Sequence, residues 1–588
     1  MTYKQGIDAL KTGNFETAIS LLTAAIKTDP NNGQIYFYLA QALSADNRKG
    51  EAIVCFTHAL AHDNTLLSAA KLLANLLSHL SLRDHSRINP AGLAASFCLK
   101  GIEHQVLVPT AIAYLKQCTG LGDAINIGEA SNWTSSAKWL LSSKGRSVLC
   151  DKLLQTLLCT AANTDTEVEY ILTALRKSLL FAPVGETLRK SHILNFTCAL
   201  IRQVEINEYV FVVSLEEIHR LHDIYIDLEG VRGNSRKAMD NLMLKALYFP
   251  LKQLIGSEGK VIADLKIKPK VLGEIIQTHL AERQSEECAA NKIRATGIIE
   301  DEVSKSVASL YEKNPYPRWL SLYLPDLSSH RRQLAKYFST QELAFMDHPF
   351  KVLIGGAGTG KQAIEAAHGY GHNAALTAID ISLSSLAYAK RMSNSFKIKN
   401  VQFVQCDILN CGLISDVFDV VECIGVLHHM DSPLIGWKAL VEKLRPGGLM
   451  KIGLYSTYAR KSIASLRDDI KARGLSSDDQ TIRNYRQGII SEGETGKRAF
   501  LLNSADFYSL SNFRDLLFHV SEKHLSIPKI ASFMTNNGLT FHGFQIPMDI
   551  AEGFPDDDDK SNLDQWHKFE VANPETFKGM YIFWCRKN

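Results

Sequence analysis

The chain has 588 residues, 46% of them hydrophobic and 22% charged, which is an ordinary globular composition at a length that exceeds a single hydrophobic core. We therefore expect about three or four domains rather than a disordered chain. The balance of 65 basic and 62 acidic residues gives a net charge of only +3, which excludes a sequence-wide field for binding nucleic acid.

The sequence shows neither a membrane span nor a secretion signal. It contains no run of about 18 apolar residues, and its first residues lack an apolar core. The 11 cysteines include no C-x-x-C pair, so we interpret them as reduced core thiols rather than zinc ligands. These features predict a cytoplasmic protein.

The N-terminal region repeats itself with a period of 34 residues. Ala18 aligns with Ala52, and the larger Leu22 aligns with Phe56. Small residues at helix contacts and a large one in the gap resemble tetratricopeptide repeats; the alternative is a generic helical hairpin. Because a stable stack needs about three units, we expect the apolar residues 65–82 to form a third layer. Such a stack would bind a protein or peptide.

Turn-forming residues and the spacing of apolar residues divide the rest of the chain into domains. A polar segment with proline and glycine, residues 83–95, predicts a boundary. Apolar residues three or four positions apart then predict a helical domain. We expect helical repeats at residues 1–82, an all-helical middle domain at 94–300 and an α/β domain at 301–588.

The α/β domain begins with a glycine-rich turn. A short apolar run leads to Gly356, Gly358 and Gly360, and a helical pattern follows. Such a strand–turn–helix unit lets the backbone approach a ligand and presents free N–H groups. A second apolar run ends at Asp380, where a carboxylate can accept bonds from ribose hydroxyls. A nucleoside ligand is indicated, but the glycines alone leave NAD(P), other nucleotides and S-adenosylmethionine (AdoMet) open.

The following segments decide between these ligands. Asp407 ends a third predicted strand, Glu422 lies in a fourth, and V-L-H-H follows at residues 426–429. A helix then ends in R-P-G-G before a fifth strand. Over residues 351–455 this order resembles the class I AdoMet-dependent methyltransferases, in the subgroup whose fourth strand leads into V-L-H-H. The resemblance implies a doubly wound, seven-stranded Rossmann-like domain at the end of an otherwise α-helical chain.

The resemblance also implies AdoMet as the cofactor. It assigns the contacts to Gly356, Ala357, Gly358, Gly360, Asp380, Ile381, Asp407, Ile408 and Glu422. The glycines would lie under the methionine and ribose, Asp380 would hold the ribose hydroxyls, and Asp407 would face the adenine amino group. Many relatives carry an acid two residues before the first glycine, and this chain departs from them with Ile354.

Two prolines make residues 314–319, just before the α/β domain's first strand, extended and stiff. In class I methyltransferases this segment commonly lies over the cofactor. We therefore expect Tyr311, Tyr316, Arg318 and Trp319 to line the acceptor pocket. The alternative is a clasp between the helical and catalytic domains.

Methyl transfer from a sulfonium requires alignment of the nucleophile and, where the nucleophile is neutral, removal of a proton. The resemblance places His428 and His429 beside the methyl group, and an unperturbed histidine pKa of about 6.5 suits a base. Tyr455 is a weaker candidate. The alternative is that these histidines only pack on the cofactor.

After the fifth strand the fold needs one more helix and an antiparallel hairpin, which we predict at residues 526–537, 539–546 and 580–586. Residues 456–525 then form an insertion. Within it, Asp515, His519 and Glu522 share one predicted helical face. A single helix supplies too few metal ligands and the transfer needs no metal, so we expect polar pocket lining and no metal site.

The methyl acceptor is the least determined feature. The turn after the fourth strand lacks the Asp/Asn-Pro-Pro-aromatic pattern of many nucleic-acid methyltransferases, so nucleic acid is not expected. We predict a protein side chain recruited through the repeats. One alternative is a small molecule or lipid, with the repeats serving assembly or a homodimer. Another is a non-catalytic adaptor, against which the nearly complete cofactor motifs argue.

Overall fold

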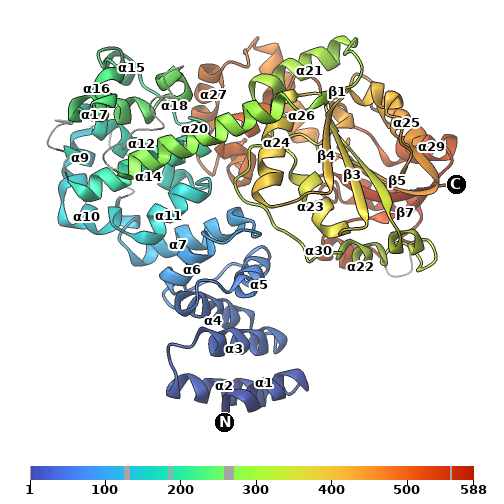
Figure 1. Cartoon of the computed structure of the whole chain (residues 1–588), viewed down its shortest axis with the longest axis horizontal. Helices are drawn as coiled ribbons and strands as arrows, with labels where there is room; N and C mark the ends of the chain where they lie inside the picture. Colours follow the sequence, from blue (N-terminus) through green and yellow to red (C-terminus); the bar gives the residue numbers. More distant parts are fainter. Residues whose placement is uncertain (1, 125–132, 183–186, 189, 257–269, 556–558) are drawn as a thin grey trace. The chain divides into compact units, whose positions relative to one another are not determined.

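The computed structural model describes residues 2–124, 133–182, 187–188, 190–256, 270–555 and 559–588 (Figure 1). The chain divides into two compact units. The first unit comprises Met1–Ala281, Leu320–Tyr323 and Asp479–Leu510, and the second comprises Glu282–Trp319, Leu324–Asp478 and Ser511–Asn588. The insertion predicted at residues 456–525 is therefore divided, because its central part packs with the first unit.

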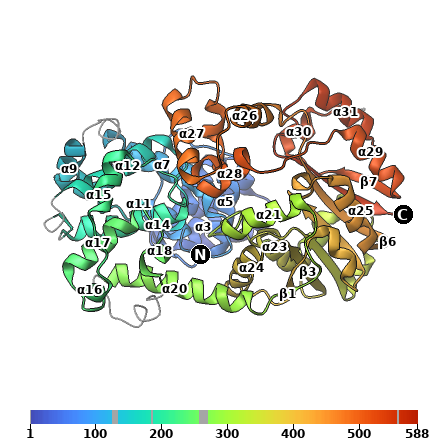
Figure 2. The same cartoon turned by 90° about the horizontal axis from the view of Figure 1, so that it is seen from above.

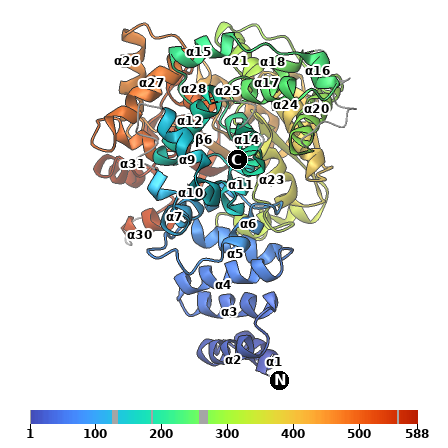
Figure 3. The same cartoon turned by 90° about the vertical axis from the view of Figure 1, so that its left-hand side faces the viewer.

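Antiparallel helical hairpins stacked in succession open the first unit (Figure 3). The aligned residues Ala18, Ala52, Leu22 and Phe56 are all buried, as the 34-residue period predicts. The apolar segment after them forms α5, which packs against α4 as a third layer. The helices are α1 (Thr2–Lys11), α2 (Phe15–Thr28), α3 (Gly33–Ala45), α4 (Lys49–His62) and α5 (Leu67–Leu77).

The segment predicted as a polar linker contains a packed helix, α6 (Pro90–Ser96). The Asn89 side chain caps it, and proline occupies its first turn, as helix N-termini favour. A Cβ at Gly92 would lie 1.7 Å from the Thr57 carbonyl oxygen, so this helix contacts α4 through its glycine. The polar composition marks the start of a helix here and not a free linker.

The remainder of the first unit is helical, as the periodicity predicts. Its elements are η1 (His104–Leu107), α7 (Val108–Cys118), η2 (Gly122–Ala124), α9 (Trp133–Leu141), α10 (Ser143–Leu149), α11 (Lys152–Thr160), α12 (Thr166–Phe181), α14 (Ser191–Ile206), α15 (Leu215–His222), α16 (Leu228–Arg232), α17 (Arg236–Ala246), α18 (Leu251–Ile255), α27 (Asp479–Glu492), η7 (Ala499–Asn503) and η8 (Ala505–Tyr508), with α20 (Lys270–Ala290) running across the division. Buried Arg486 of α27 donates to both carboxylate oxygens of Glu169 on α12, at 2.6 and 2.7 Å. This pair ties the central part of the insertion to the helical region.

A sheet in the order β1-β4-β3-β2-β5-β6-β8-β7 organises the second unit (Figure 2). The last two neighbour pairs, β6–β8 and β8–β7, are antiparallel and the others are parallel. The strands are β1 (Arg294–Ala295), β2 (Phe350–Gly355), β3 (Ala374–Asp380), β4 (Val401–Gln405), β5 (Phe418–Ile424), β6 (Leu444–Leu454), β7 (Leu539–Phe544) and β8 (Tyr581–Lys587). The two-residue edge strand β1 adds to the seven strands that the sequence predicts.

Helices complete the second unit: α21 (Glu302–Lys313), α22 (His330–Leu334), η4 (Ala344–Asp347), α23 (Lys361–Tyr370), α24 (Leu383–Ser395), η5 (Ile408–Leu413), η6 (Leu427–His429), α25 (Pro433–Lys443), α26 (Lys461–Ala472), α28 (Leu510–Phe518), α29 (Ile527–Asn536), α30 (Met548–Gly553) and α31 (Leu563–Ala572). The apolar inner strands are buried, as parallel strands between helices must be. Trp437 of α25 stacks on Phe533 of α29 at 4.1 Å, so these helices share one face of the sheet. The final helix and hairpin, α29, β7 and β8, confirm the predicted end of the fold. Among the helices described, none combines the length and apolarity that crossing a bilayer requires.

Candidate functional site

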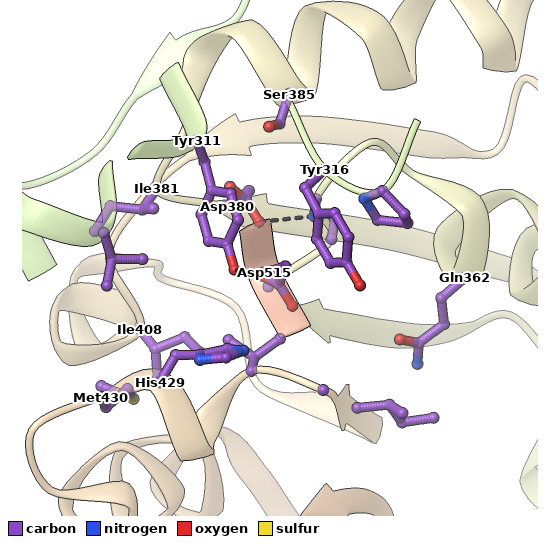
Figure 4. Close-up of a pocket in the computed structure, with 18 of the residues that line it drawn as sticks. Tyr311, Tyr316, Gln362, Asp380, Ile381, Ser385, Ile408, His429, Met430 and Asp515 are labelled. Carbon is purple, nitrogen blue, oxygen red and sulfur yellow. Dashed lines mark hydrogen bonds between the residues drawn. The ribbon is translucent and has the colours of Figure 1, made fainter. Parts of the chain in front are cut away.

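A cavity of about 430 Å³ lies at the carboxyl ends of the central strands, where ligands bind in open α/β sheets (Figure 4). All its lining residues belong to the second unit. One set of lining residues, which we call the glycine-turn wall, consists of Gly356, Ala357, Gly358, Asp380, Ile381, Asp407 and Ile408. A second set, the histidine wall, consists of Tyr311, Tyr316, His429, Tyr455 and Asp515.

Asp380 organises the glycine-turn wall. Its carboxylate accepts hydrogen bonds from the backbone N–H of Gly358 at 2.7 Å and of Ser382 at 2.9 Å (Figure 4 draws the bond to the turn). Burial raises the pKa of Asp380 to about 6, against the opposing effect of these N–H groups. The carboxylate therefore shapes the turn as well as facing the cavity.

The three glycines of the turn have different roles. All have positive φ, at 72°, 50° and 84°, which glycine adopts without strain. A Cβ at Gly356 would meet the Val426 side chain at 2.3 Å, and one at Gly358 would meet the Tyr316 carbonyl oxygen at 2.8 Å. Gly360 is not among the lining residues, and its Cβ would meet Ala389 at 2.5 Å. Gly360 thus lies outside the cavity lining, unlike the other two glycines, and allows close packing against α24; its predicted contact with the cofactor stays a prediction.

Two of the predicted acids differ in their access to the cavity. Asp407 lines it next to Ile408, and its side chain also accepts from the N–H of Leu409 at 3.0 Å. Glu422 is buried and does not line it. Tyr370 and Gln362 both donate to the Glu422 carboxylate, the second at 2.9 Å. These donors hold the Glu422 carboxylate behind the glycine-turn wall. Glu422 therefore affects the cavity by positioning Gln362, which lines the cavity.

The two adjacent histidines also differ in their access to the cavity. His429 lines the cavity, and its Nδ1 lies 2.9 Å from the Ser521 carbonyl oxygen. His428 is fully buried and stacks on the Tyr455 ring at 3.8 Å, outside the lining. Burial lowers the pKa of His428 well below its ordinary value, so the base predicted there is replaced by a packing residue. Tyr455 lines the cavity, and the Arg460 guanidinium lies over its ring at 3.9 Å.

The segment before the sheet supplies two of its four predicted residues. Tyr311 and Tyr316 line the cavity with their rings stacked at 6.0 Å. Trp319 instead donates its Nε1 hydrogen to the Thr359 carbonyl oxygen at 3.2 Å, and Arg318 lies over the Tyr388 ring. Neither lines the cavity. Their contacts with Thr359 and Tyr388 fasten the segment to the sheet domain.

The polar residues of the insertion are arranged differently from the predicted helical face. The helix α28 ends at Phe518, so Asp515 is helical while His519 and Glu522 lie in the following loop. Tyr311 Oη lies 2.8 Å from Asp515 Oδ1 and 3.1 Å from His519 Nε2. Burial raises the pKa of Asp515 and lowers the pKa of His519 to about 2.

Glu522 leaves this group and faces Arg460, at 2.9 Å, and His524, at 2.8 Å. Burial alone would raise the pKa of Glu522, but hydrogen bonds from His524 and Arg460 outweigh it and lower that pKa to about 2. Among the residues described, His429 takes its place beside Asp515 and His519. The third member of the group comes from a different part of the chain.

Sequence reasoning missed the contribution of α23. Lys361, Gln362 and Glu365, in its first turns, line the cavity (Figure 4 shows Gln362 across from His429). Their positions one, two and five residues after Gly360 were the available signal, because a helix that starts at a ligand-binding turn presents its first turn to the ligand. They follow Ile354, where the anchoring acid of many relatives is replaced, by seven, eight and eleven residues.

The cavity fits AdoMet. Its volume lies within the range of small-molecule sites, roughly 300–1,000 Å³. The backbone of the turn is free of side chains where Gly356 and Gly358 line the cavity, and two buried carboxylates, Asp380 and Asp407, stand at the ends of neighbouring strands. Apolar Ile381 and Ile408, the residues that follow those acids, line the cavity and can pack against a purine ring.

Comparison with known proteins agrees with this geometry. The methyltransferase-domain family model matches residues 350–492, and a tetratricopeptide-repeat model matches residues 9–76. An uncharacterized protein of Synechococcus sp. is 28% identical over 299 residues, which cover 47% of this chain and 70% of that protein.

Solved structures resemble the chain weakly. PKMT2 from Rickettsia typhi, in complex with AdoHcy, aligns with a TM-score of 0.34 and 16% identity over 44% of this chain and 53% of its own. A putative S-adenosylmethionine-dependent methyltransferase from Listeria monocytogenes aligns at 0.26 and 18%, over 44% and 98%. The chain thus matches only about half the length of PKMT2, and likenesses this weak carry no functional argument. The chain thus carries tetratricopeptide repeats and a methyltransferase domain, and its strand order and cavity agree with a Rossmann-like methyltransferase fold that uses AdoMet.

Proposed function

We propose that this protein transfers a methyl group from AdoMet to a protein side chain that the repeats recruit. The observation that carries the proposal is the composition of the cavity. The glycine-turn wall offers two carboxylates and bare backbone, whereas the histidine wall offers aromatic rings, an imidazole and a buried carboxylate. One cavity therefore combines groups suited to a nucleoside with groups suited to a polar acceptor. When bound, AdoMet supplies the electrophilic methyl group.

The chain's own residues would orient the acceptor and take up its proton. The Nδ1 of His429 faces the Ser521 carbonyl oxygen, which leaves Nε2 with a lone pair directed to the cavity. Tyr311 and Tyr316 form an aromatic side against which an extended acceptor side chain can pack. Alignment of this kind contributes most of the rate in a direct displacement.

The repeats present aromatic side chains that suit a peptide. Tyr36 and Tyr38 on α3 are only partly buried. The Tyr36 ring stacks between His58 at 5.4 Å and His62 at 5.3 Å, and Tyr38 lies 6.1 Å from Tyr3. Partly exposed aromatic rings held rigid by neighbours are typical anchors of protein interfaces. Stacked hairpins also provide the extended surface that peptide binding uses.

Radiolabelled AdoMet in cell lysate tests the recruitment step. A variant with Tyr36→Ser and Tyr38→Ser should bind AdoMet as the wild type does and lose most labelling of protein bands. The matched control is Tyr225→Ser, which removes an exposed tyrosine of the same unit outside the repeats. A deletion of residues 1–89 is less suitable, since α6 packs on α4.

Two outcomes would contradict the proposal. If the label appears in the organic extract and in no protein band, the acceptor is a small molecule or lipid and the repeats serve assembly. If the double variant labels protein as well as Tyr225→Ser does, recruitment does not use these two tyrosines.

A further inference from the structure

Three potential metal ligands meet at the histidine wall, two of its own residues and His519 packed against them. His429 follows β5, Asp515 lies on α28, and His519 follows that helix. One ligand atom from each lies within 4.8 Å of the other two, and all three side chains are buried. We propose that this group, His429, Asp515 and His519, binds one divalent transition-metal ion beside the acceptor position. His429 is a ligand while the ion is bound, and it takes up the acceptor's proton only in the metal-free protein.

The hydrogen bonds around the two imidazoles prepare them as ligands. The Ser521 carbonyl oxygen lies 2.9 Å from Nδ1 of His429 and 2.7 Å from Nδ1 of His519. The Ser521 N–H also lies 3.1 Å from the second Nδ1; in the tautomer that donates to the carbonyl oxygen, the Nδ1 atoms of both histidines carry the proton. Both Nε2 atoms then carry lone pairs. Metal-bound histidines are held by a carbonyl or carboxylate in this way.

The Tyr311 hydroxyl oxygen lies as far from two of the proposed ligands as ligands of one ion lie from each other. Its hydroxyl oxygen lies 2.8 Å from Asp515 Oδ1 and 3.1 Å from His519 Nε2. Ligands bound at about 2.0–2.2 Å to one ion lie roughly 3 Å apart. With a single proton, the hydroxyl can donate to only one of these two acceptors. A cation would satisfy both, with the Tyr311 oxygen as a possible further ligand.

The third ligand is available on the cavity side. Within the described part of the chain, no residue forms a hydrogen bond with His429 Nε2. The neighbouring guanidinium groups do not compete for Asp515, since Arg460 and Arg467 pair with Glu522 at 2.9 and 3.7 Å. Two imidazoles and one carboxylate favour zinc or iron(II) over calcium or magnesium. Three protein ligands also leave coordination positions toward the cavity.

Metal content provides a test that does not depend on methylation. The inference rests on the proposed function only for the identity of the acceptor beside the ion. Because metal binding is measured separately from methylation, failure of the metal site can be distinguished from failure of the proposed function. Full-length protein is freed of metal with a chelator, incubated with Zn²⁺ and desalted, and its zinc is counted by mass spectrometry. We expect one Zn²⁺ per chain. With Co²⁺ instead, a visible d–d absorption should appear and should shift on addition of azide, which occupies the open positions.

Conservative variants identify the ligands. Asp515→Asn, His519→Gln and His429→Gln should each weaken Zn²⁺ binding by at least about a hundredfold, since partners outside the ligand set are already worth about 10- to 100-fold. The matched control is His542→Gln, because His542 Nδ1 also contacts a backbone carbonyl oxygen, that of Tyr337 at 3.0 Å, outside this group. AdoHcy binding by calorimetry reports that each variant is folded.

Three results would overturn the inference. The first is a wild-type protein that retains no stoichiometric zinc. The second is zinc that remains in the folded ligand variants, which would place it elsewhere. The third is a Co²⁺ spectrum that does not respond to azide, which would leave no position for an acceptor.

Discussion

The two walls of the cavity are built in different ways. The glycine-turn wall comes from one continuous stretch, in which β2, β3 and β4 each end in the residues that face the ligand. The histidine wall combines α21, the turn after β5, the start of the segment after β6, and α28. The first wall therefore depends on local strand–turn–helix geometry, and the second depends on contacts between distant segments. Substitutions in the first should alter AdoMet affinity, whereas those in the second should alter turnover or stability.

The largest expected effect is on turnover. His429→Ala removes an imidazole that lines the cavity, and we expect a loss of about 10²- to 10⁴-fold in turnover, as for other acid–base groups, with little change in AdoMet affinity. His428→Ala is the matched control, because His428 is buried against Tyr455 and should affect unfolding more than turnover. Equal losses of turnover in both variants would show that the two histidines do not differ as the structure indicates.

The next effect is on stability. Glu522→Gln leaves the buried Arg460 without its charged partner, and we expect the free energy of unfolding to fall by about 3–5 kcal/mol. Chemical denaturation at neutral pH measures it. Because the pKa of Glu522 is lowered from 4.5 to about 2, its stabilisation is present above pH 4.5 and is lost as pH falls toward 2.

The pH dependence of the variant provides a check on that assignment. In Glu522→Gln the wild-type decline in stability across this acidic window should be reduced. A variant that declines as steeply as the wild type would mean that other carboxyl groups dominate there.

A smaller effect is expected in the glycine-turn wall. Asp380→Ala removes the acceptor for two backbone N–H groups and the predicted partner of the ribose hydroxyls, so AdoMet binding should weaken by about 1.5–3 kcal/mol. Calorimetry measures it, with unfolding as the control for the turn itself. Unchanged affinity would contradict the placement of the ribose, and absence of binding by the wild type would contradict the cofactor assignment.

The smallest expected effect is at Glu422, which lies behind the glycine-turn wall, whereas Asp380 is part of that wall. Glu422→Gln should change AdoMet affinity by less than about threefold, since Glu422 contacts Gln362 and Tyr370 rather than the cavity. Calorimetry of AdoMet binding to both variants, Glu422→Gln and Asp380→Ala, makes the comparison direct. A loss as large as that of Asp380→Ala would restore the direct cofactor contact that the family resemblance implies.

Much of the fold could be predicted from residue patterns because it depends on local signals. The 34-residue spacing places the small alanines at helix contacts, and the final helix and hairpin lie where the class fold requires them. The errors arose where a local signal has two meanings. The pattern at Asn89 and Pro90 is typical of a linker, but these residues begin a packed helix. The spacing of Gly360 predicts a ligand contact, but the missing side chain there also allows close packing against Ala389.

By itself, the sequence determined the methyltransferase domain, the repeats and most of the glycine-turn wall, because strands that end in glycine or acid carry that information within a few residues. The tertiary structure decided which of the adjacent histidines faces the cavity, since neighbouring residues of a 3₁₀ turn point about 120° apart and only one of them can face it. It also decided that His429 joins Asp515 and His519. Side chains 86 and 90 positions apart share no periodicity, and only packing around the Ser521 carbonyl oxygen brings them together.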